Sequence, residues 1–343
     1  MKDFVKSFLS DRHPLRILYH RVMAVLAAIF FRFPANEMTV IAVTGTNGKT
    51  TTCNLIHQIF TEAGKRTGMI TTVNFKIVKE ERANEFKQTT LSPFLMQRLL
   101  RDMVKARCEV AVIEVTSHAM IQSRMWGINV DTAVFTNLSH DHLDYHGTME
   151  EYKAAKGRLF NELNVSARKS GVPKMTVINQ DDAEQEYFSR FPADHQFMFG
   201  IQKGTYNARN LEARPDGTTF MIKIPNGEEV VNFKIPGRMN VYNALAAATV
   251  GVAHHIALPT IKTALEKMQA VPGRLETINE GQPYTVVVDY AHAADALEQL
   301  LTLFREVTAG KLYLVFGATG DRDKSKRPRM GEIADKYADF IVL

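Results

Sequence analysis

Residues 40–52 read VIAVTGTNGKTTT, an apolar β-branched run followed by a glycine-bearing turn and then by a helix-like segment, Asn54–Ala63. A strand, a glycine turn and a helix in this order form a phosphate cradle, because the N–H groups of the turn and the helix N-terminus point at one anion. In such a cradle we expect Lys49 to reach the β- and γ-phosphates of a nucleotide and the Thr50 hydroxyl to bind Mg²⁺. The wider Walker pattern has Gly where Val43 stands, so only the shorter core G-x-x-G-K-T is met. The alternative is a strand–turn–helix that carries Gly and Lys without binding phosphate.

Length and composition indicate an ordinary globular protein. The length of 343 residues predicts two or three domains. The chain has 45% hydrophobic and 23% charged residues, a composition that is typical of globular proteins and not of disordered or fibrous ones. A formal net charge of +5 suits a small anionic substrate but gives no reason to infer nucleic-acid binding. The two cysteines, Cys53 and Cys108, have no metal-ligand spacing, so we expect neither a disulfide scaffold nor zinc, and we expect a cytoplasmic compartment.

The first 38 residues predict a short helical leader without a secretory signal. Its most apolar run, Val22–Phe31, is shorter than the ~20 residues that a membrane span needs. A helix is expected from Pro14 to Pro34, with large apolar residues near helical spacing at Leu15, Leu18, Tyr19, Val22, Leu26, Ile29, Phe30 and Phe33. Two interpretations stay open for residues 15–33: packing on the next domain or a protein partner, or a peripheral contact with the inner face of a membrane.

From Thr39 onward, apolar strands alternate with helices, a pattern that predicts an α/β fold with a P-loop-type parallel sheet. The expected strands are Arg66–Val73, Glu109–Val115, Asp131–Thr136 and Lys174–Asn179, and the helices Pro93–Lys105, Glu150–Leu163, Asn240–His254 and Thr260–Met268. Short antiparallel strands are expected within residues 195–235. After a linker near residues 270–273 the pattern restarts with Thr285–Val288, Ala294–Val307, Lys311–Phe316, Arg329–Tyr337 and Asp339–Leu343. The predicted domains are a leader (1–38), a central ATP-binding domain (39–271) and a partial Rossmann-like domain (272–343).

Polar residues follow several expected strands at the edge where parallel sheets bind ligands. Glu114 ends one of these strands and can supply a carboxylate oxygen to the same Mg²⁺ as Thr50, or can act only as a capping or salt-bridged acid. A second strand end is crowded with the side chains of His140, Asp141, His142, Asp144 and His146. A zinc hydrolase is the obvious metal interpretation of this cluster, but the phosphate cradle favours Mg²⁺ with one histidine beside carboxylates.

A set of motifs in this chain resembles those of the Mur ligases, most closely the MurE type. The motifs are TGTNGKTTT (44–52), EVTSHAMIQSR (114–124), FTNLSHDHLDYHGTMEEYKAAKGRLF (135–160), PGRMNVYNALAAA (236–248), VPGRLE (271–276), VDYAHAADALE (288–298) and VFGATGDRDKSKRPRMGEIA (315–334). The resemblance covers residues 40–343. It implies an ATP-dependent ligase of peptidoglycan synthesis, which serves cell-wall biogenesis, cell shape and cell division. Such a ligase joins an amino acid to a UDP-muramoyl-dipeptide through an acyl phosphate.

The resemblance also implies roles for individual residues. It makes Lys49, Glu114, His142 and Lys156 catalytic, with one Mg²⁺ on Thr50 and Glu114 and another near His142. Lys156, by spacing alone a surface lysine, would be carbamylated by CO₂ and help to position the second Mg²⁺. The implied ATP-binding residues are Gly45, Thr46, Asn47, Gly48, Lys49, Thr50, Thr51, Asn243 (adenine side), Arg274 (phosphates, or alternatively a linker salt bridge) and Asp289 (ribose). The implied residues for the muramoyl-peptide are Thr89, Thr90, Thr116, Gln122 and Arg124.

Several departures from the family pattern bear on the acceptor. The family usually has Asn at the position of Gln88 and Ser at the position of Thr116. It usually has Thr or Ser before Asp in the motif AH-x-x-D, where this chain has Ala293-Ala294. The leader replaces the family's uridine-binding domain, and the chain ends at Leu343 before the family's D-N-P-R stretch, so we expect this form to be weak or inactive. Two alternatives remain open: a related ligase with a lipid-linked or non-UDP acceptor, and a non-catalytic nucleotide-binding scaffold.

Overall fold

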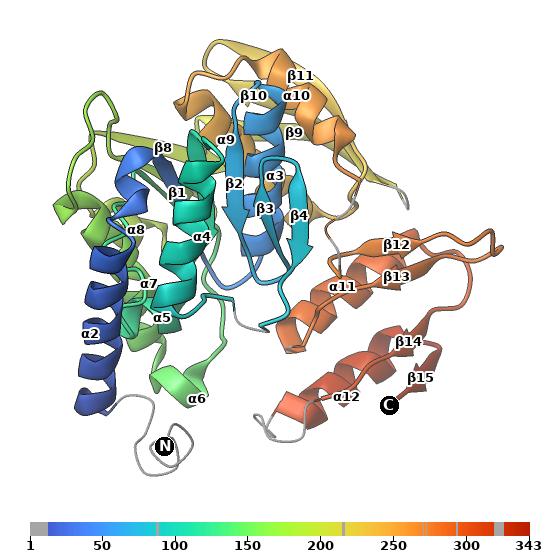
Figure 1. Cartoon of the computed structure of the whole chain (residues 1–343). Helices are drawn as coiled ribbons and strands as arrows, with labels where there is room; N and C mark the ends of the chain where they lie inside the picture. Colours follow the sequence, from blue (N-terminus) through green and yellow to red (C-terminus); the bar gives the residue numbers. More distant parts are fainter. Residues whose placement is uncertain are drawn as a thin grey trace.

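The computed structural model describes residues 13–86, 89–214, 217–269, 271, 273–292, 294–318 and 326–343. Its main body is an eleven-stranded sheet in the order β11-β10-β9-β8-β7-β6-β1-β5-β2-β3-β4 (Figure 1). The strands are β1 (Thr39–Thr44), β2 (Thr67–Ile70), β3 (Asn74–Ile77), β4 (Glu80–Ala83), β5 (Val110–Glu114), β6 (Thr132–Phe135), β7 (Met175–Asn179), β8 (His195–Gly200), β9 (Tyr206–Arg214), β10 (Gly217–Ile224) and β11 (Gly227–Phe233). The predicted α/β fold is therefore confirmed.

The middle of the sheet is parallel and its two edges are antiparallel. Strand β1 lies between β5 and β6, with Val43 opposite both Glu114 and Val134, so the three strands end together. The antiparallel strands expected within residues 195–235 are confirmed for β9–β11, but β8 pairs parallel with β7 and joins the main sheet. The hairpin of β3 and β4 was not predicted, because residues 74–83 carry mixed polar side chains without a clear alternation.

Helices cover both faces of the sheet. One face packs against α3 (Lys49–Glu62), α9 (Arg238–Ala253) and α10 (Leu258–Lys267). The other packs against α4 (Pro93–Lys105), α5 (Ser117–Ile121) and α7 (Met149–Val165), with α6 (Leu143–His146) and α8 (Gln185–Ser189) nearby. Helix α3 begins at Lys49, five residues before the predicted start, so its free N–H groups belong to the glycine turn itself.

The leader helix α2 (Pro14–Phe30) packs on the central body through the face opposite to the large apolar residues. Ala24, Ala27 and Ala28 are buried, and Ala28 lies close to Gly127, since small residues let the two backbones approach. The large apolar residues of α2 face solvent with exposed fractions of 47–72%: Leu15, Leu18, Tyr19, Val22, Leu26, Ile29 and Phe30. We call these seven residues the outer stripe. Among the described helices, none is long and apolar enough to cross a membrane.

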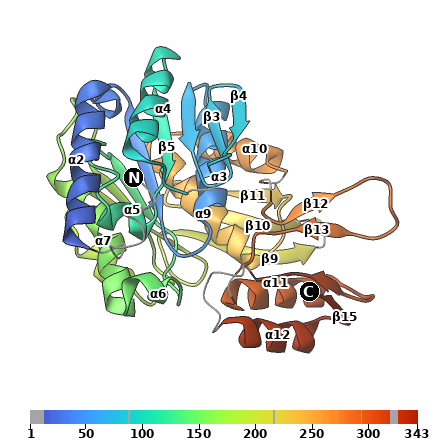
Figure 2. The ribbon, with the colours of Figure 1, turned by 60° about the horizontal axis from the view of Figure 1, so that its bottom comes forward.

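The C-terminal part folds around its own small core. It comprises β12 (Glu276–Ile278), β13 (Val286–Val288), α11 (Ala294–Val307), β14 (Tyr313–Val315), α12 (Lys326–Tyr337) and β15 (Phe340–Val342). Helices α11 and α12 pack together through Leu297, Leu301, Met330 and Ile333, and β14 pairs parallel with β15. Figure 2 shows this part beside the edge formed by β9–β11. The predicted alternation is confirmed here, except that β12 was missed. Gln88, Ala270, Pro272, Ala293 and residues 319–325, which include the whole of the sequence GDRD, lie outside the described residues.

Candidate active site

The phosphate cradle follows β1 and needs both of its glycines. Gly45 has φ +154°, and a Cβ there would lie 1.9 Å from Thr136 Oγ1. Gly48 has φ +81°, and its Cβ would lie 2.1 Å from Asn243 Oδ1. The loop between them is fixed from the next strand end, because the Asn47 N–H donates to Asn137 Oδ1 at 2.9 Å. A side chain at either glycine would therefore displace the loop that presents its N–H groups to a phosphate.

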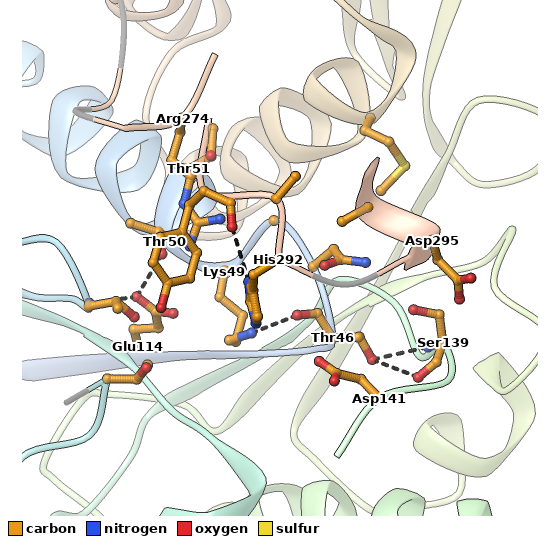
Figure 3. Close-up of a pocket in the computed structure, with 18 of the residues that line it drawn as sticks. Thr46, Lys49, Thr50, Thr51, Glu114, Ser139, Asp141, Arg274, His292 and Asp295 are labelled. Atoms are coloured by element: carbon orange, nitrogen blue, oxygen red, sulfur yellow. Dashed lines mark hydrogen bonds between the residues drawn. The ribbon is translucent and has the colours of Figure 1, made fainter. Parts of the chain in front are cut away.

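Lys49 lies at the start of α3 and its ammonium turns back over the loop. Its Nζ donates to the Thr46 carbonyl at 2.7 Å (Figure 3). Burial lowers the pKa of Lys49, and Glu114 opposes this by favouring the charged form. The cation is thus held within the cradle, where the charge of a phosphate would stabilise it.

Thr50 and Glu114 lie side by side at the ends of neighbouring elements. The Thr50 hydroxyl donates to Glu114 Oε2 at 2.9 Å, and the backbone N–H of Thr72 donates to the same oxygen at 2.9 Å (Figure 3). Glu114 is 1% exposed, so its carboxylate is directed at this point and not at solvent. A hydroxyl and a carboxylate oxygen beside a phosphate cradle are hard donors that fit Mg²⁺, which takes one or two protein ligands together with phosphates and water.

The histidine-rich segment divides into side chains with different surroundings. Asp141 and His142 line the large cleft, and His142 takes φ +55° at the start of α6. His146 is buried, with its Nε2 2.8 Å from Ser117 Oγ, whereas His140 is exposed. Within the described part of the chain, no group of three or more His, Cys, Asp or Glu residues is arranged to hold a metal.

The spacing of Lys156 in the sequence predicted a surface lysine, but the structure buries it. It is 2% exposed, and its Nζ donates to the Gly45 carbonyl at 2.6 Å and lies 4.4 Å from the centre of the Tyr152 ring. Burial holds the pKa of Lys156 well below its usual value, and nearby Lys49 lowers it further. The geometry places this buried amine directly behind the phosphate cradle.

The cradle opens into a cleft of about 1640 Å³ that residues from the C-terminal part also line. Arg274, Asp289 and Asn243 all face it, so the structure brings the expected nucleotide residues together. Arg274 stacks on Tyr290, with its Cζ 4.5 Å from the ring centre. The Asp289 carboxylate accepts N–H bonds from Leu275 at 2.9 Å and Ala291 at 2.8 Å.

The residues expected to hold the muramoyl-peptide line the same cleft on its other side. Thr90 Oγ1 lies 3.1 Å from Thr116 Oγ1, and Arg124 donates to the Thr90 carbonyl at 2.5 Å. Gln122 donates to Tyr145 Oη at 3.3 Å, and its buried Oε1 has no hydrogen-bond partner. These contacts join three separate chain segments into one polar wall.

Sequence reasoning missed several residues that line the cleft. The largest omissions are Arg16 and His20, which belong to the leader helix, and Thr72, whose N–H fixes Glu114. Tyr145 and His292 stand inside quoted motifs but received no role. No local signal identifies Arg16 or His20, because their position depends on how α2 packs on the rest of the protein.

Comparisons with known proteins agree with this geometry. The family model "Mur ligase middle domain" matches residues 43–251, and the model "Mur ligase, glutamate ligase domain" matches residues 273–343. The UDP-N-acetylmuramoyl-L-alanyl-D-glutamate–2,6-diaminopimelate ligases of Bacillus velezensis and Bacillus licheniformis are 42% and 43% identical over 94% and 96% of this chain. The chain spans 66% and 68% of the length of these relatives.

Solved structures give the same result for the fold. A structure of a UDP-N-acetylmuramoyl-L-alanyl-D-glutamate–2,6-diaminopimelate ligase matches with a TM-score of 0.70 and 33% identity, covering 89% of this chain and 61% of the other. Folylpolyglutamate synthase of Mycobacterium tuberculosis, solved with ADP and AMPPCP, shares the fold with a TM-score of 0.75 at 18% identity, covering 93% of this chain and 78% of the other. On the family models and the relatives together, the chain belongs to the Mur ligase family.

Proposed function

We propose that the chain is an ATP-dependent amide ligase that adds an amino acid to a UDP-muramoyl-dipeptide, in the cytoplasm. The observation that carries this proposal is the single cleft, which joins a phosphate cradle and the Thr50–Glu114 pair to the wall built on Thr90, Thr116 and Arg124. We also propose that the chain divides into a leader (residues 1–38), a central ATP-binding domain (39–271) and a partial C-terminal ligase domain (272–343). The resemblance to diaminopimelate ligases supports the reaction class, and the amino acid is left for the assay to identify.

The proposed reaction has two steps. A carboxylate oxygen of the acceptor attacks the γ-phosphorus of ATP, ADP leaves, and an acyl phosphate forms. The amine of the amino acid then attacks the acyl carbon, and inorganic phosphate leaves as the amide forms and the amine loses its proton. The first step brings an anionic carboxylate onto the anionic γ-phosphate, so the Lys49 ammonium and the N–H groups at the start of α3 would stabilise the charge on the transferred phosphoryl group. Arg274 would pair with the polyphosphate from the opposite wall.

Mg²⁺ bound by Thr50 and Glu114 would supply further neutralisation of the phosphate oxygens. For the second cation site, we propose His142 together with carbamylated Lys156. CO₂ adds to the neutral amine of a lysine, the amine loses a proton, and the cation becomes an anion. The buried position and lowered pKa of Lys156 support this, because they favour the reactive neutral form.

The direct test is the release of phosphate from ATP by the purified chain with UDP-muramoyl-dipeptide and each of a panel of amino acids that includes diaminopimelate and lysine. We expect release that depends on both the acceptor and one amino acid. A C-terminally extended version serves as a reference. Phosphate release by neither version, with any amino acid, would remove the proposal. Nucleotide binding without any turnover by either version would instead favour the scaffold alternative.

A peripheral membrane contact through α2 is a second proposal, and the outer stripe favours it. The stripe presents seven large apolar side chains to solvent on a helix that carries no acidic residue but includes Arg16 and Arg21. An amphipathic helix of this composition suits the surface of an anionic bilayer, which attracts the arginines while the stripe enters the headgroup region. A lipid-linked acceptor would then be presented to the cleft from that surface.

Replacing Ile29 with Asp tests the membrane contact. We expect the wild type to sediment with vesicles that contain anionic lipid and Ile29→Asp to bind roughly 10-fold less, because the change removes apolar area and adds a like charge to the interface. Val165→Asp is the matched control, since Val165 is 70% exposed but lies at the end of α7, outside the stripe. Equal sedimentation of the wild type and Ile29→Asp would argue against the contact. A shift from dimer to monomer in Ile29→Asp would replace it with an interface between two copies.

A further inference from the structure

We propose that Arg16 and His20 of the leader helix bind the diphosphate group that joins the muramoyl-peptide to its carrier. The inference rests on the proposed function, because it takes the acceptor to be a muramoyl-peptide on a diphosphate. The same diphosphate occurs in a nucleotide carrier and in a lipid carrier, so the chemistry of the site is shared by the two sources.

The placement of α2 supports this role. The helix packs beside α4 (Figure 1). Arg16 and His20 lie on its N-terminal half and line the same cleft as Thr90 and Arg124. Of the other α2 residues, the outer stripe faces solvent and the buried alanines face the protein. The polar residues Arg16 and His20 are the ones that the helix presents to the cleft. The leader helix therefore forms part of the lining of the cleft, in addition to packing on the central body.

The charges that line the cleft are unevenly distributed. The acidic lining residues lie near the phosphate cradle (Glu114 and Asp141) or within residues 289–306. The lining residues of α2, of residues 89–93 and of residues 122–124 include Arg16, Arg124 and His20 but no acid. This part of the lining therefore attracts an anionic group.

The chain itself links the contacts along this part of the cleft in sequence. The reacting carboxylate must lie at Lys49, and Thr90 and Thr116 follow along the wall. Ser92 and Pro93, at the N-terminus of the 13-residue helix α4, come next, and α4 packs against α2. The positive end of α4 adds to the attraction for an anion at this point. A muramoyl-dipeptide that extends from Lys49 along this wall toward α2 would direct its diphosphate to the part of the cleft lined by Arg16 and His20.

Calorimetric titration of the intact chain tests the proposal with three acceptors. They are UDP-muramoyl-dipeptide, a short-chain lipid diphosphate of the same muramoyl-dipeptide, and the muramoyl-dipeptide without diphosphate. We expect the double variant Arg16→Gln/His20→Gln to weaken binding of both diphosphate acceptors roughly 10- to 100-fold, and binding of the third less than about 2-fold. The ratio between the two diphosphate acceptors for the wild type identifies the carrier.

Arg98→Gln is the matched control on the neighbouring helix α4. Arg98 is exposed, does not line the cleft, and lies 4.0 Å from Asp102 on the same helix, so its loss should leave all three affinities unchanged. Thermal melts of each variant check that α2 remains folded. An equal loss of affinity for all three acceptors in the double variant, or no loss for any, would overturn the inference while leaving the proposed function standing. Failure of the wild type to bind any of the three would overturn the proposed function and the inference with it.

Discussion

Replacing Lys49 with Met is expected to lower acceptor-dependent phosphate release by about 100- to 1000-fold, the usual loss when one preorganised cationic or hydrogen-bonding group is removed from a charge-developing site. Lys49 is the cation at the phosphate cradle, and its Nζ is held 2.7 Å from the Thr46 carbonyl. Methionine keeps the length and the apolar part of the side chain, so the loss would come from the charge and the hydrogen bonds. The measurement is the rate of phosphate release at saturating ATP and acceptor.

Lys79→Met is the control for this prediction. Lys79 is exposed in the turn between β3 and β4, so the same change in charge and composition occurs away from the cleft. We expect wild-type rates from this variant. Retention of more than about a third of the wild-type rate by Lys49→Met would contradict the role of the cradle in the reaction.

The second large effect is expected at Lys156. Replacing it with Ala should reduce turnover by about 100-fold or more, since the variant has no amine that CO₂ could convert into an anion beside the cradle. Lys153→Ala, on the same helix and ion-paired with Glu184 at 2.8 Å, is the matched control and should remain active. The carbamate itself is measured by ¹³C NMR after incubation with ¹³C-bicarbonate, as a carbonyl signal that the wild type shows and Lys156→Ala lacks.

The pH dependence of this signal follows from the direction of the pKa shift. A lysine reacts with CO₂ only as the neutral amine, and burial lowers the pKa of Lys156, so the neutral form is present at a lower pH than for an ordinary lysine. Carbamate and activity should therefore be retained near neutral pH and lost together as the solution is acidified through the lowered pKa. Identical activity in CO₂-free and CO₂-containing buffers, without a carbamate signal in the wild type, would exclude this role.

The sequence was sufficient for the parts of the fold where local signals agree with tertiary structure. The run VIAVTGTNGKTTT predicted the strand, the turn and the helix because its glycines and β-branched residues have few alternative conformations. Helix Pro93–Lys105 was predicted with its observed bounds, since proline at the first turn and a strong apolar periodicity mark it clearly. The β3–β4 hairpin lacked such a pattern and was missed.

The helix α2 shows why a periodicity does not say which face is buried. Its large apolar residues recur at helical spacing, yet the protein buries Ala24, Ala27 and Ala28, because closely packed backbones favour small side chains. Lys156 shows the same limit in the site. Nothing near it in the sequence marks it as buried, and only the packing of α7 under the cradle places its amine at Gly45. The contributions of Arg16 and His20 to the cleft depend likewise on tertiary structure alone.

The central claim is that the cleft joins an acceptor carboxylate to an amine through an acyl phosphate. Isotopic labelling tests it most directly: the acceptor is prepared with ¹⁸O in the reacting carboxylate and turned over with ATP and the amino acid. One oxygen of that carboxylate becomes the bridge of the acyl phosphate and leaves with the phosphoryl group. The account predicts inorganic phosphate that carries one ¹⁸O atom for each amide formed. Amide formation with unlabelled phosphate would contradict it.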